Sequence, residues 1–327
     1  MTIQTATQTT TQTTIDAYTA LTQEAALLPR AAGALLVLTG ADRSDFLHRM
    51  TTNNIARLQP GMAAVTILTS PTARILFTFT VLCREDALWL LPAPEQTTAL
   101  ERHLRGQIFF MDKVKVQNVS ATHARLRLMG PQSQTLLTAV GINAQDLADD
   151  HWVEHEDVVV LNQQRFDVPG YELILPQEHY DQWVERLTAA GAQLLPDDQA
   201  YQHYRIELGR PAVGAELTEA YNPLEAGLAW ACAENKGCYT GQEIIARQIT
   251  YDKVTKHLVG LRSEHGLEPG TEVTVEKRTV GTITSTASSP TLATPIALAI
   301  IKRPYHEAGT QLMAAGATVE VVPLPFL

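Results

Sequence analysis

The sequence predicts an α+β protein, with a body of small sheets that carry helices on one side and a small antiparallel β-barrel after it. Two observations indicate this architecture. Strand-like and helix-like segments alternate up to about Lys256, and beyond it only short β-rich segments remain, separated by glycine and proline. The 327 residues are also enough for two or three domains, each with its own core.

The body is expected to span residues 15–255. Residues 1–14 are nearly all Thr and Gln, which is too polar a composition to pack, so we predict a disordered tail there. Apolar runs bounded by turn residues then predict strands. These strands cover residues 34–38, 63–68, 75–82, 87–91, 113–119, 123–128 and 171–175.

Helices are predicted where apolar residues recur every three or four positions. One begins near Asp42, one near Pro94 and one at Pro131, and a fourth spans residues 178–190. A fifth, capped by Asp197 or Asp198, ends at Gly209. The barrel, residues 256–327, is predicted from strands at 258–261, 272–275, 281–285, 297–301 and 318–322.

Composition excludes several classes of protein. The formal charge is −10 and no cluster of Lys and Arg is present, so direct binding to nucleic acid or to an anionic membrane is disfavoured. The three cysteines and ten histidines lack metal-ligand spacing, and we expect no bound metal. No apolar run reaches the roughly 18 residues of a membrane span. The first 29 residues contain no Lys or Arg, unlike a signal or transit peptide, which favours the cytoplasm.

One segment, residues 236–243, combines a cation, a thiol and a helix start in the sequence KGCYTGQE. Thr240 and Glu243 fit a capping box, which places Cys238 just before a helix N-terminus. The helix dipole and Lys236 would both favour a thiolate there, so Cys238 is a candidate reactive thiol. The alternative is a small buried apolar cysteine, with Glu243 acting only as a cap.

The predicted helix that ends at Gly209 presents a carboxylate beside an aromatic ring. Tyr204 and Glu207 are three positions apart and therefore share one face. The alternative is a solvated glutamate at the end of a core helix, paired with His203.

Three segments together resemble the YgfZ family of folate-binding proteins, which are related to the glycine-cleavage T-protein and support iron–sulfur enzymes. They are YRIELGRP at residues 204–211, NPLEAGL at 222–228 and KGCYTGQEIIAR at 236–247. The resemblance covers nearly the whole chain. It implies a folate-binding body of two ferredoxin-like units with a C-terminal barrel docked on it.

The resemblance also implies a ligand, partners and site residues. The ligand would be tetrahydrofolate or a one-carbon derivative, and Glu207 would read the pterin edge through two hydrogen bonds. Tyr204 would supply an aromatic wall, and Lys236 or Arg247 a cation for the glutamate tail. The partners would be iron–sulfur client enzymes, including those that modify tRNA. Cys238 would transiently hold sulfur, iron or a partner's thiol, or be reversibly oxidised.

The resemblance leaves open whether the protein is an enzyme. T-proteins are aminomethyltransferases with a carboxylate on an early strand, whose position falls near Phe77 or Thr78 here. The chain has no Asp or Glu from Phe46 through Arg84, so that strand cannot supply the acid. Tetrahydrofolate-dependent aminomethyl transfer is therefore the alternative to the accessory role. A partner domain of a sarcosine-type oxidase is a third reading, which the absence of a Gly-x-Gly-x-x-Gly motif disfavours.

Overall fold

The computed structural model describes residues 15–30 and 33–327. The predicted disordered tail, residues 1–14, lies outside the described residues. A helix over residues 15–23 leads into the first strand. Within the described ranges, no helix is long and apolar enough to cross a bilayer.

The first unit of the body is a five-stranded sheet with the order β3-β4-β5-β2-β6. Its strands are β2 (Leu36–Thr39), β3 (Ala63–Thr69), β4 (Ile75–Cys83), β5 (Ala87–Pro92) and β6 (Lys115–Asn118). Its helical segments are α2 (Arg43–His48), η1 (Ile55–Arg57), η2 (Pro94–Gln96) and α3 (Thr97–Gly106). Helices α2 and α3 cover one face, where Phe46 and Leu100 pack with Leu36 and Leu88.

The second unit is a six-stranded sheet with the order β11-β1-β7-β10-β9-β8. Its strands are β1 (Ala26–Arg30), β7 (His123–Met129), β8 (His151–His155), β9 (Val158–Gln163), β10 (Gly170–Pro176) and β11 (Gln193–Leu194). Its helical segments are α4 (Ser133–Ala139), η3 (Gln177–His179) and α5 (Tyr180–Ala189). Each sheet has the β-α-β-β-α-β order of a ferredoxin-like unit with one additional edge strand after the first helix, β3 in the first sheet and β8 in the second. In the second sheet β1 is also inserted between β11 and β7.

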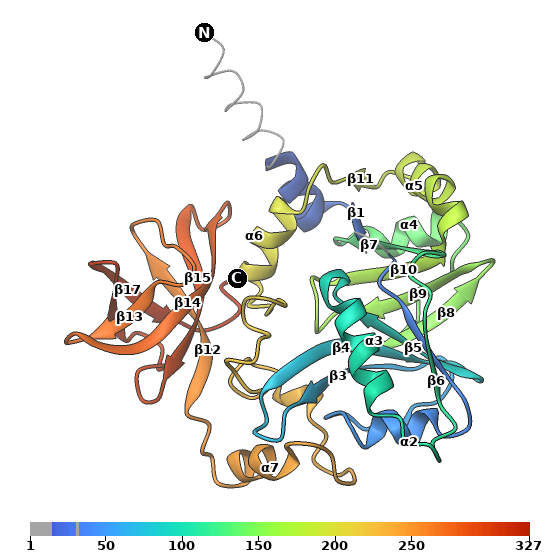
Figure 1. Cartoon of the computed structure of the whole chain (residues 1–327). Helices are drawn as coiled ribbons and strands as arrows, with labels where there is room; N and C mark the ends of the chain where they lie inside the picture. The colour runs from blue at the N-terminus through green and yellow to red at the C-terminus, as the bar shows by residue number, and fades with distance from the viewer. Residues whose placement is uncertain (1–14, 31–32) are drawn as a thin grey trace.

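The two sheets face each other through the sides that carry no helices (Figure 1). Leu82 and Leu91 of the first sheet pack there against Leu161 and Ile174 of the second. Because side chains alternate along a strand, residues 124, 126 and 128 of β7 pack under α4 and α5, whereas residues 125 and 127 point toward the first sheet. This alternation positions the charged side chains of the candidate site.

The chain then crosses to a closed barrel of order β12-β15-β14-β13-β16-β17. The crossing contains α6 (Gln199–Glu207), η4 (Ala229–Ala231) and α7 (Gln242–Thr250). The barrel strands are β12 (Lys256–Ser263), β13 (Glu272–Val275), β14 (Arg278–Ser289), β15 (Thr294–Lys302), β16 (Gln311–Ala314) and β17 (Ala317–Val322). Helix α6 docks on the barrel, with Ile206 packed against Ala287 and Leu298 (Figure 1).

These elements confirm the predicted α+β class, the two ferredoxin-like units and the barrel. The sequence reasoning missed the helix at residues 15–23 and strands β1, β8, β9, β11 and β16. Strand β1 contains Pro29, which usually argues against a strand inside a sheet. The proline is tolerated because β11 pairs only with Ala26 and Leu27, so beyond them β1 has a single neighbour.

Candidate functional site

A cavity of about 300 Å³ lies between the two sheets and α6. Guanidinium groups of the second sheet and of the α6 region line it, together with hydroxyl groups of β4. The polar side chains of the lining include Arg30, Arg125, Arg205, Arg210, Thr78 and Thr80. Apolar side chains also line the cavity, among them Leu91, Phe166 and Leu217. The lining therefore combines charged, hydroxyl and apolar side chains.

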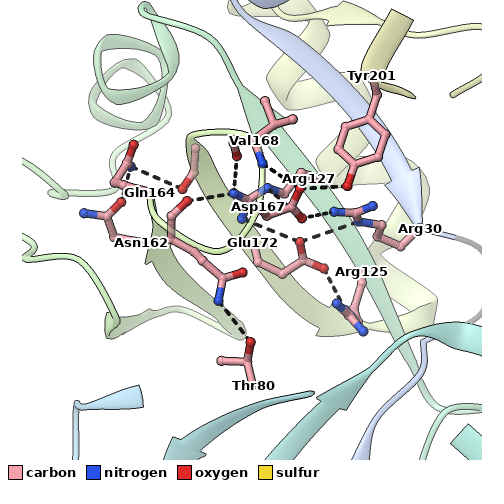
Figure 2. A network of polar contacts seen from close by, with 12 residues as sticks. Arg30, Thr80, Arg125, Arg127, Asn162, Gln164, Asp167, Val168, Glu172 and Tyr201 are labelled. Atoms are coloured by element: carbon pink, nitrogen blue, oxygen red, sulfur yellow. Dashed lines mark hydrogen bonds and ion pairs between the residues drawn. The ribbon is translucent and has the colours of Figure 1, made fainter. Parts of the chain in front are cut away.

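A buried ionic network, which we call the ionic wall, includes Arg30, Arg125 and Asp167 of this lining (Figure 2). Arg125 Nε donates to Glu172 Oε1 at 2.7 Å, and Arg30 pairs with Asp167. Arg127 is fully buried and lies between the two carboxylates, with its nitrogens 3.7 Å from Asp167 and 3.9 Å from Glu172. Three guanidinium groups thus face two carboxylates away from solvent.

The network keeps Asp167 ionised. Burial alone would raise the pKa of this carboxyl group, but Arg30 and Arg127 outweigh burial and lower it to about 2. The Tyr201 hydroxyl donates to Asp167 at 2.7 Å, and burial together with this carboxylate raises the pKa of Tyr201 to about 12. Asp167 is therefore an acceptor that holds the wall together, with little capacity to exchange protons near neutral pH.

Several buried donors in this region have no hydrogen-bond partner within the described residues. They are Nε of Arg30, Nε and Nη1 of Arg127, Nε of Arg210 and the Thr78 hydroxyl. Arg30, Arg210 and Thr78 line the cavity, whereas the two Arg127 nitrogens lie within 4 Å of carboxylates. Buried polar groups are normally satisfied, so the donors that line the cavity can bind water or the acceptor atoms of a ligand. The excess of guanidinium over carboxylate groups favours an anionic ligand.

Strand β4 lines the cavity with hydroxyl groups, at the position where the resemblance to T-proteins predicts a carboxylate. Thr78 is 3% exposed, and Thr80 accepts a hydrogen bond from Gln163 Nε2 at 3.0 Å. The strand, residues 75–83, contains no carboxylate. The carboxylates that line the cavity, Asp167 among them, come from other elements.

Helix α6 directs Glu207 toward the barrel. The side chain is 0% exposed, and its two carboxylate oxygens accept from the hydroxyls of Tyr18 and Ser289. The alternative of a solvated glutamate is therefore wrong. Tyr204 packs edge-to-face on Tyr18 with ring centroids 5.9 Å apart and lines a separate cavity of about 490 Å³. The two residues share a region of α6 as predicted, but neither lines the cavity between the sheets.

The Lys236 side chain hydrogen-bonds to the backbone of the first unit. Its ammonium group donates to the carbonyls of His48, Thr51 and Asn53, at 2.7 Å for the first and last of these. Burial lowers the pKa of Lys236 to about 8. Arg247 is exposed on α7. Neither cation lines the cavity between the sheets, and their proposed contact with a glutamate tail stays a prediction.

The predicted capping box before α7 is wrong. The N-cap is Gly241 in the left-handed conformation, with φ of 83°, and no side chain caps the helix. A Cβ at this position would lie 2.9 Å from Thr69 Oγ1, so glycine lets the helix approach the β3–β4 turn closely. The helix therefore starts one residue later than Thr240 and Glu243 require, and Cys238 lies three residues before the N-cap.

The three cysteines differ in access. Cys238 is exposed, so the alternative of a buried apolar cysteine is wrong, while its reactivity stays a prediction. Cys83 and Cys232 are buried, and burial raises the pKa of both thiols, that of Cys232 to about 12. Within the described residues, no group of His, Cys, Asp and Glu side chains is arranged to hold a metal ion.

Sequence reasoning missed the ionic wall, although the sequence carries a signal for it. In β7 two arginines alternate with leucines, and in β10 a glutamate occupies the equivalent alternate position. Strand pairing places Glu172 opposite Arg127. Opposite charges at alternate positions of otherwise apolar strands indicate a buried polar face.

Two family models match the chain. Residues 5–236 match the GCVT N-terminal domain, and residues 256–327 match the glycine cleavage T-protein C-terminal barrel domain. An aminomethyltransferase of Desulforamulus reducens is 29% identical over 289 residues, which cover 84% of this chain and 78% of that protein. "Putative transferase At1g60990, chloroplastic" of Arabidopsis thaliana is 32% identical over 256 residues, or 76% of this chain, but the match spans only 58% of that relative.

The fold is also that of a solved structure. The aminomethyltransferase T of the glycine cleavage system from Bartonella henselae superposes with a TM-score of 0.87 at 20% identity, covering 96% of this chain and 89% of the other.

Proposed function

This chain belongs to the glycine cleavage T-protein family, and from that premise we propose that it binds tetrahydrofolate or a one-carbon derivative in the cavity between its two sheets. We propose further that it acts in the cytoplasm as a folate-binding accessory protein for iron–sulfur enzymes, including enzymes that modify tRNA, and that it does not transfer aminomethyl groups. The curated relatives named above are an aminomethyltransferase and a transferase, so the accessory role rests on the resemblance of residues 204–247.

The chemistry of the cavity supports a folate ligand. A folate has a flat ring with several hydrogen-bond acceptors and a carboxylate tail. The cavity lining offers apolar side chains, Phe166 among them, and guanidinium donors without a partner. Arg210 lines the cavity with a free Nε, whereas Lys236 is bound to three carbonyls. We therefore assign the tail carboxylate to Arg210, because a guanidinium group can bind it through two parallel hydrogen bonds.

One observation carries the choice of an accessory role over aminomethyl transfer. Strand β4 offers Thr78 and Thr80 to the cavity, and a threonine hydroxyl cannot serve as the acid or base of a proton transfer near neutral pH. Asp167 is held ionised by its arginine partners and cannot replace that acid. The exposed Cys238 thiol supports the accessory role, since it is free to meet a partner's thiol, sulfur or iron.

The second candidate function is tetrahydrofolate-dependent aminomethyl transfer, which the aminomethyltransferases among the relatives favour. It requires a carboxylate from outside β4. Glu95 and Asp198 line the cavity and are the residues that would have to supply it.

A titration combined with a side-by-side assay separates these functions. The purified protein is titrated calorimetrically with tetrahydrofolate and its one-carbon derivatives. The same preparation and an authentic T-protein are then assayed for methylenetetrahydrofolate formation from the aminomethylated carrier protein. We expect the protein to bind folate but to form methylenetetrahydrofolate roughly 10²–10⁴-fold more slowly than the T-protein does. This factor is the rate enhancement that a general acid or base usually contributes. Rates within tenfold of each other would establish the transferase, and no binding would refute both functions.

The accessory role is tested in a deletion strain. Loss of this protein is expected to lower the activity of iron–sulfur enzymes, and the Cys238→Ala protein is expected not to restore it. Full restoration by Cys238→Ala would refute the role of the thiol, and unchanged iron–sulfur enzymes in the deletion strain would refute the accessory function.

A further inference from the structure

Three consecutive apolar side chains project from the segment between α3 and β6. Phe109, Phe110 and Met111 are 67%, 97% and 73% exposed, and we call them the apolar tip. The other exposed large apolar side chains that the structure describes are isolated from one another in the sequence. A contiguous exposed apolar patch marks an interaction site more often than a single exposed residue does.

The apolar tip is held in a fixed turn. The Asp112 amide donates to the Phe109 carbonyl at 2.9 Å, and the Asp112 carboxylate accepts from the Phe109 amide at 2.9 Å and from Arg49 at 2.6 Å. The centre of the turn is Phe110 and Met111, where turns usually carry Gly, Asn, Asp, Pro or Ser. These side chains are therefore not needed to form the turn, and a braced turn loses little conformational entropy on binding.

A groove of about 480 Å³ adjoins the tip between α3 and β6. Ile108, Val114 and Val116 form the apolar part of its lining. The charged part consists of Glu101, Arg105 and Lys115. Strand β6 is an edge of its sheet, but Arg105 Nη2 donates to the Val116 carbonyl at 3.0 Å and covers part of that edge. The groove is thus suited to receive side chains of a partner rather than an added strand.

The surface around the tip is basic, in contrast to the chain as a whole. Residues 101–115 include four Lys or Arg and two acids, Glu101 and Asp112, which are paired with Arg105 and Arg49. The Asp42 carboxylate accepts from the Lys113 amide at 2.8 Å. Arg102, Lys113 and Lys115 are exposed, and their side chains make no hydrogen bond or ion pair with the described residues. The whole chain carries a formal charge of −10, so this local excess of positive charge favours an acidic contact.

We propose that the apolar tip and the adjoining groove dock a partner protein that presents an apolar recess edged by carboxylates. A second copy of this chain fits less well, because a two-fold contact would bring Lys113 and Lys115 of both copies together. An anionic membrane also fits less well, because it could receive the apolar tip but has no side chains to enter the adjoining groove. This surface is separate from the folate cavity, so the proposal does not depend on the proposed function.

The docking surface and the exposed thiol lie at one end of the first unit. Arg49, which holds the tip through Asp112, directly follows His48 in the chain. The His48 carbonyl accepts a hydrogen bond from Lys236, and Lys236 is two residues before Cys238 in the sequence. Figure 1 shows α2 and α7 at this same end of the body. A partner seated on the tip would therefore lie on the side of the molecule that carries the thiol.

The proposal is tested by crosslinking followed by measured affinity. A photo-crosslinking amino acid is placed at position 110 of the full chain, or at position 313 as a matched control, because Met313 is an exposed apolar residue on the barrel. The protein joined at position 110 is identified and purified. Its affinity is then measured for the wild type, for Phe110→Ser with Met111→Ser, and for Met313→Ser, each at two salt concentrations.

We expect an adduct at position 110 that is absent at 313, and at least about tenfold weaker binding by the double variant, as for anchor residues of other interfaces. Met313→Ser should bind as the wild type does, and added salt should weaken binding because the cations meet carboxylates. The proposal is overturned if no specific adduct forms, if the adduct joins two copies of this chain, or if the double variant binds with unchanged affinity. It is also overturned if the protein floats with anionic phospholipid vesicles and this flotation requires Phe110. Unfolding midpoints should be equal for all three proteins.

Discussion

Replacing Glu172 by Gln tests whether the ionic wall is a balanced, buried network. Glu172 is 2% exposed, contacts Arg125 at 2.7 Å and lies within 4 Å of Arg30 and Arg127. The amide has the same shape as the carboxylate, so no cavity forms. The change leaves three guanidinium groups with one carboxylate, Asp167, in a region from which water is largely excluded.

The magnitude follows from this burial. Removing one partner of a buried ion pair costs about 3–5 kcal/mol, because the remaining charge stays buried without compensation. For a domain of 150–250 residues, 1 kcal/mol shifts Tm by about 2–4 °C, so Tm should fall by about 6–20 °C. The matched control is Glu154→Gln, since Glu154 is 46% exposed and pairs with Arg84 at 2.7 Å. An exposed pair of this kind is worth about 0–1 kcal/mol.

Guanidinium denaturation followed by tryptophan fluorescence measures the difference. All four tryptophans precede residue 256, so the signal reports the body and not the barrel. A loss below about 1 kcal/mol for Glu172→Gln, or an equal loss for Glu154→Gln, would refute the reasoning. Either result would mean that water or a counterion compensates the arginines in the folded protein.

Further predictions concern single residues. Because the folded pKa of Asp167 is lowered to about 2, its stabilising contribution is present above pH ~4 and is lost as pH falls toward 2. The difference in unfolding free energy between wild type and Asp167→Asn should therefore disappear over that range. A difference that does not depend on pH would contradict this. Glu207→Gln should lower the unfolding free energy by about 1–3 kcal/mol, because it weakens the bonds to Tyr18 and to Ser289 of the barrel, while folate affinity changes less than threefold. A large loss in calorimetric affinity would instead support its pterin role. Cys238 should react with iodoacetamide in the native protein, whereas the two buried cysteines should react only on unfolding; a protected Cys238 would contradict its exposure. Thr78→Asp should raise aminomethyl transfer by about 10²–10⁴-fold if an acid is what the cavity lacks, and an unchanged rate would point to another missing group.

The sequence alone determined the local elements and the class of fold. Apolar runs bounded by turn residues predicted β3, β4 and β5 to within one residue of their observed ends, and residues 197–209 contain α6. These features depend on neighbours a few positions apart, and the periodicity of side chains on a strand or helix is visible in the sequence. The family motifs at residues 204–247 likewise indicated the T-protein fold, which the family models and the solved structure confirm.

Only the tertiary structure decided which charged groups meet. Lys236 donates to carbonyls more than 180 residues away in the sequence, and Glu207 accepts from Tyr18 and Ser289. The charged side chains that line the cavity instead include Arg30 and Arg210. A charged side chain that leaves water must find a partner, and the partners come from whichever strands and helices the topology brings beside it. Since that topology places residues distant in sequence side by side, spacing within one motif could not reveal it.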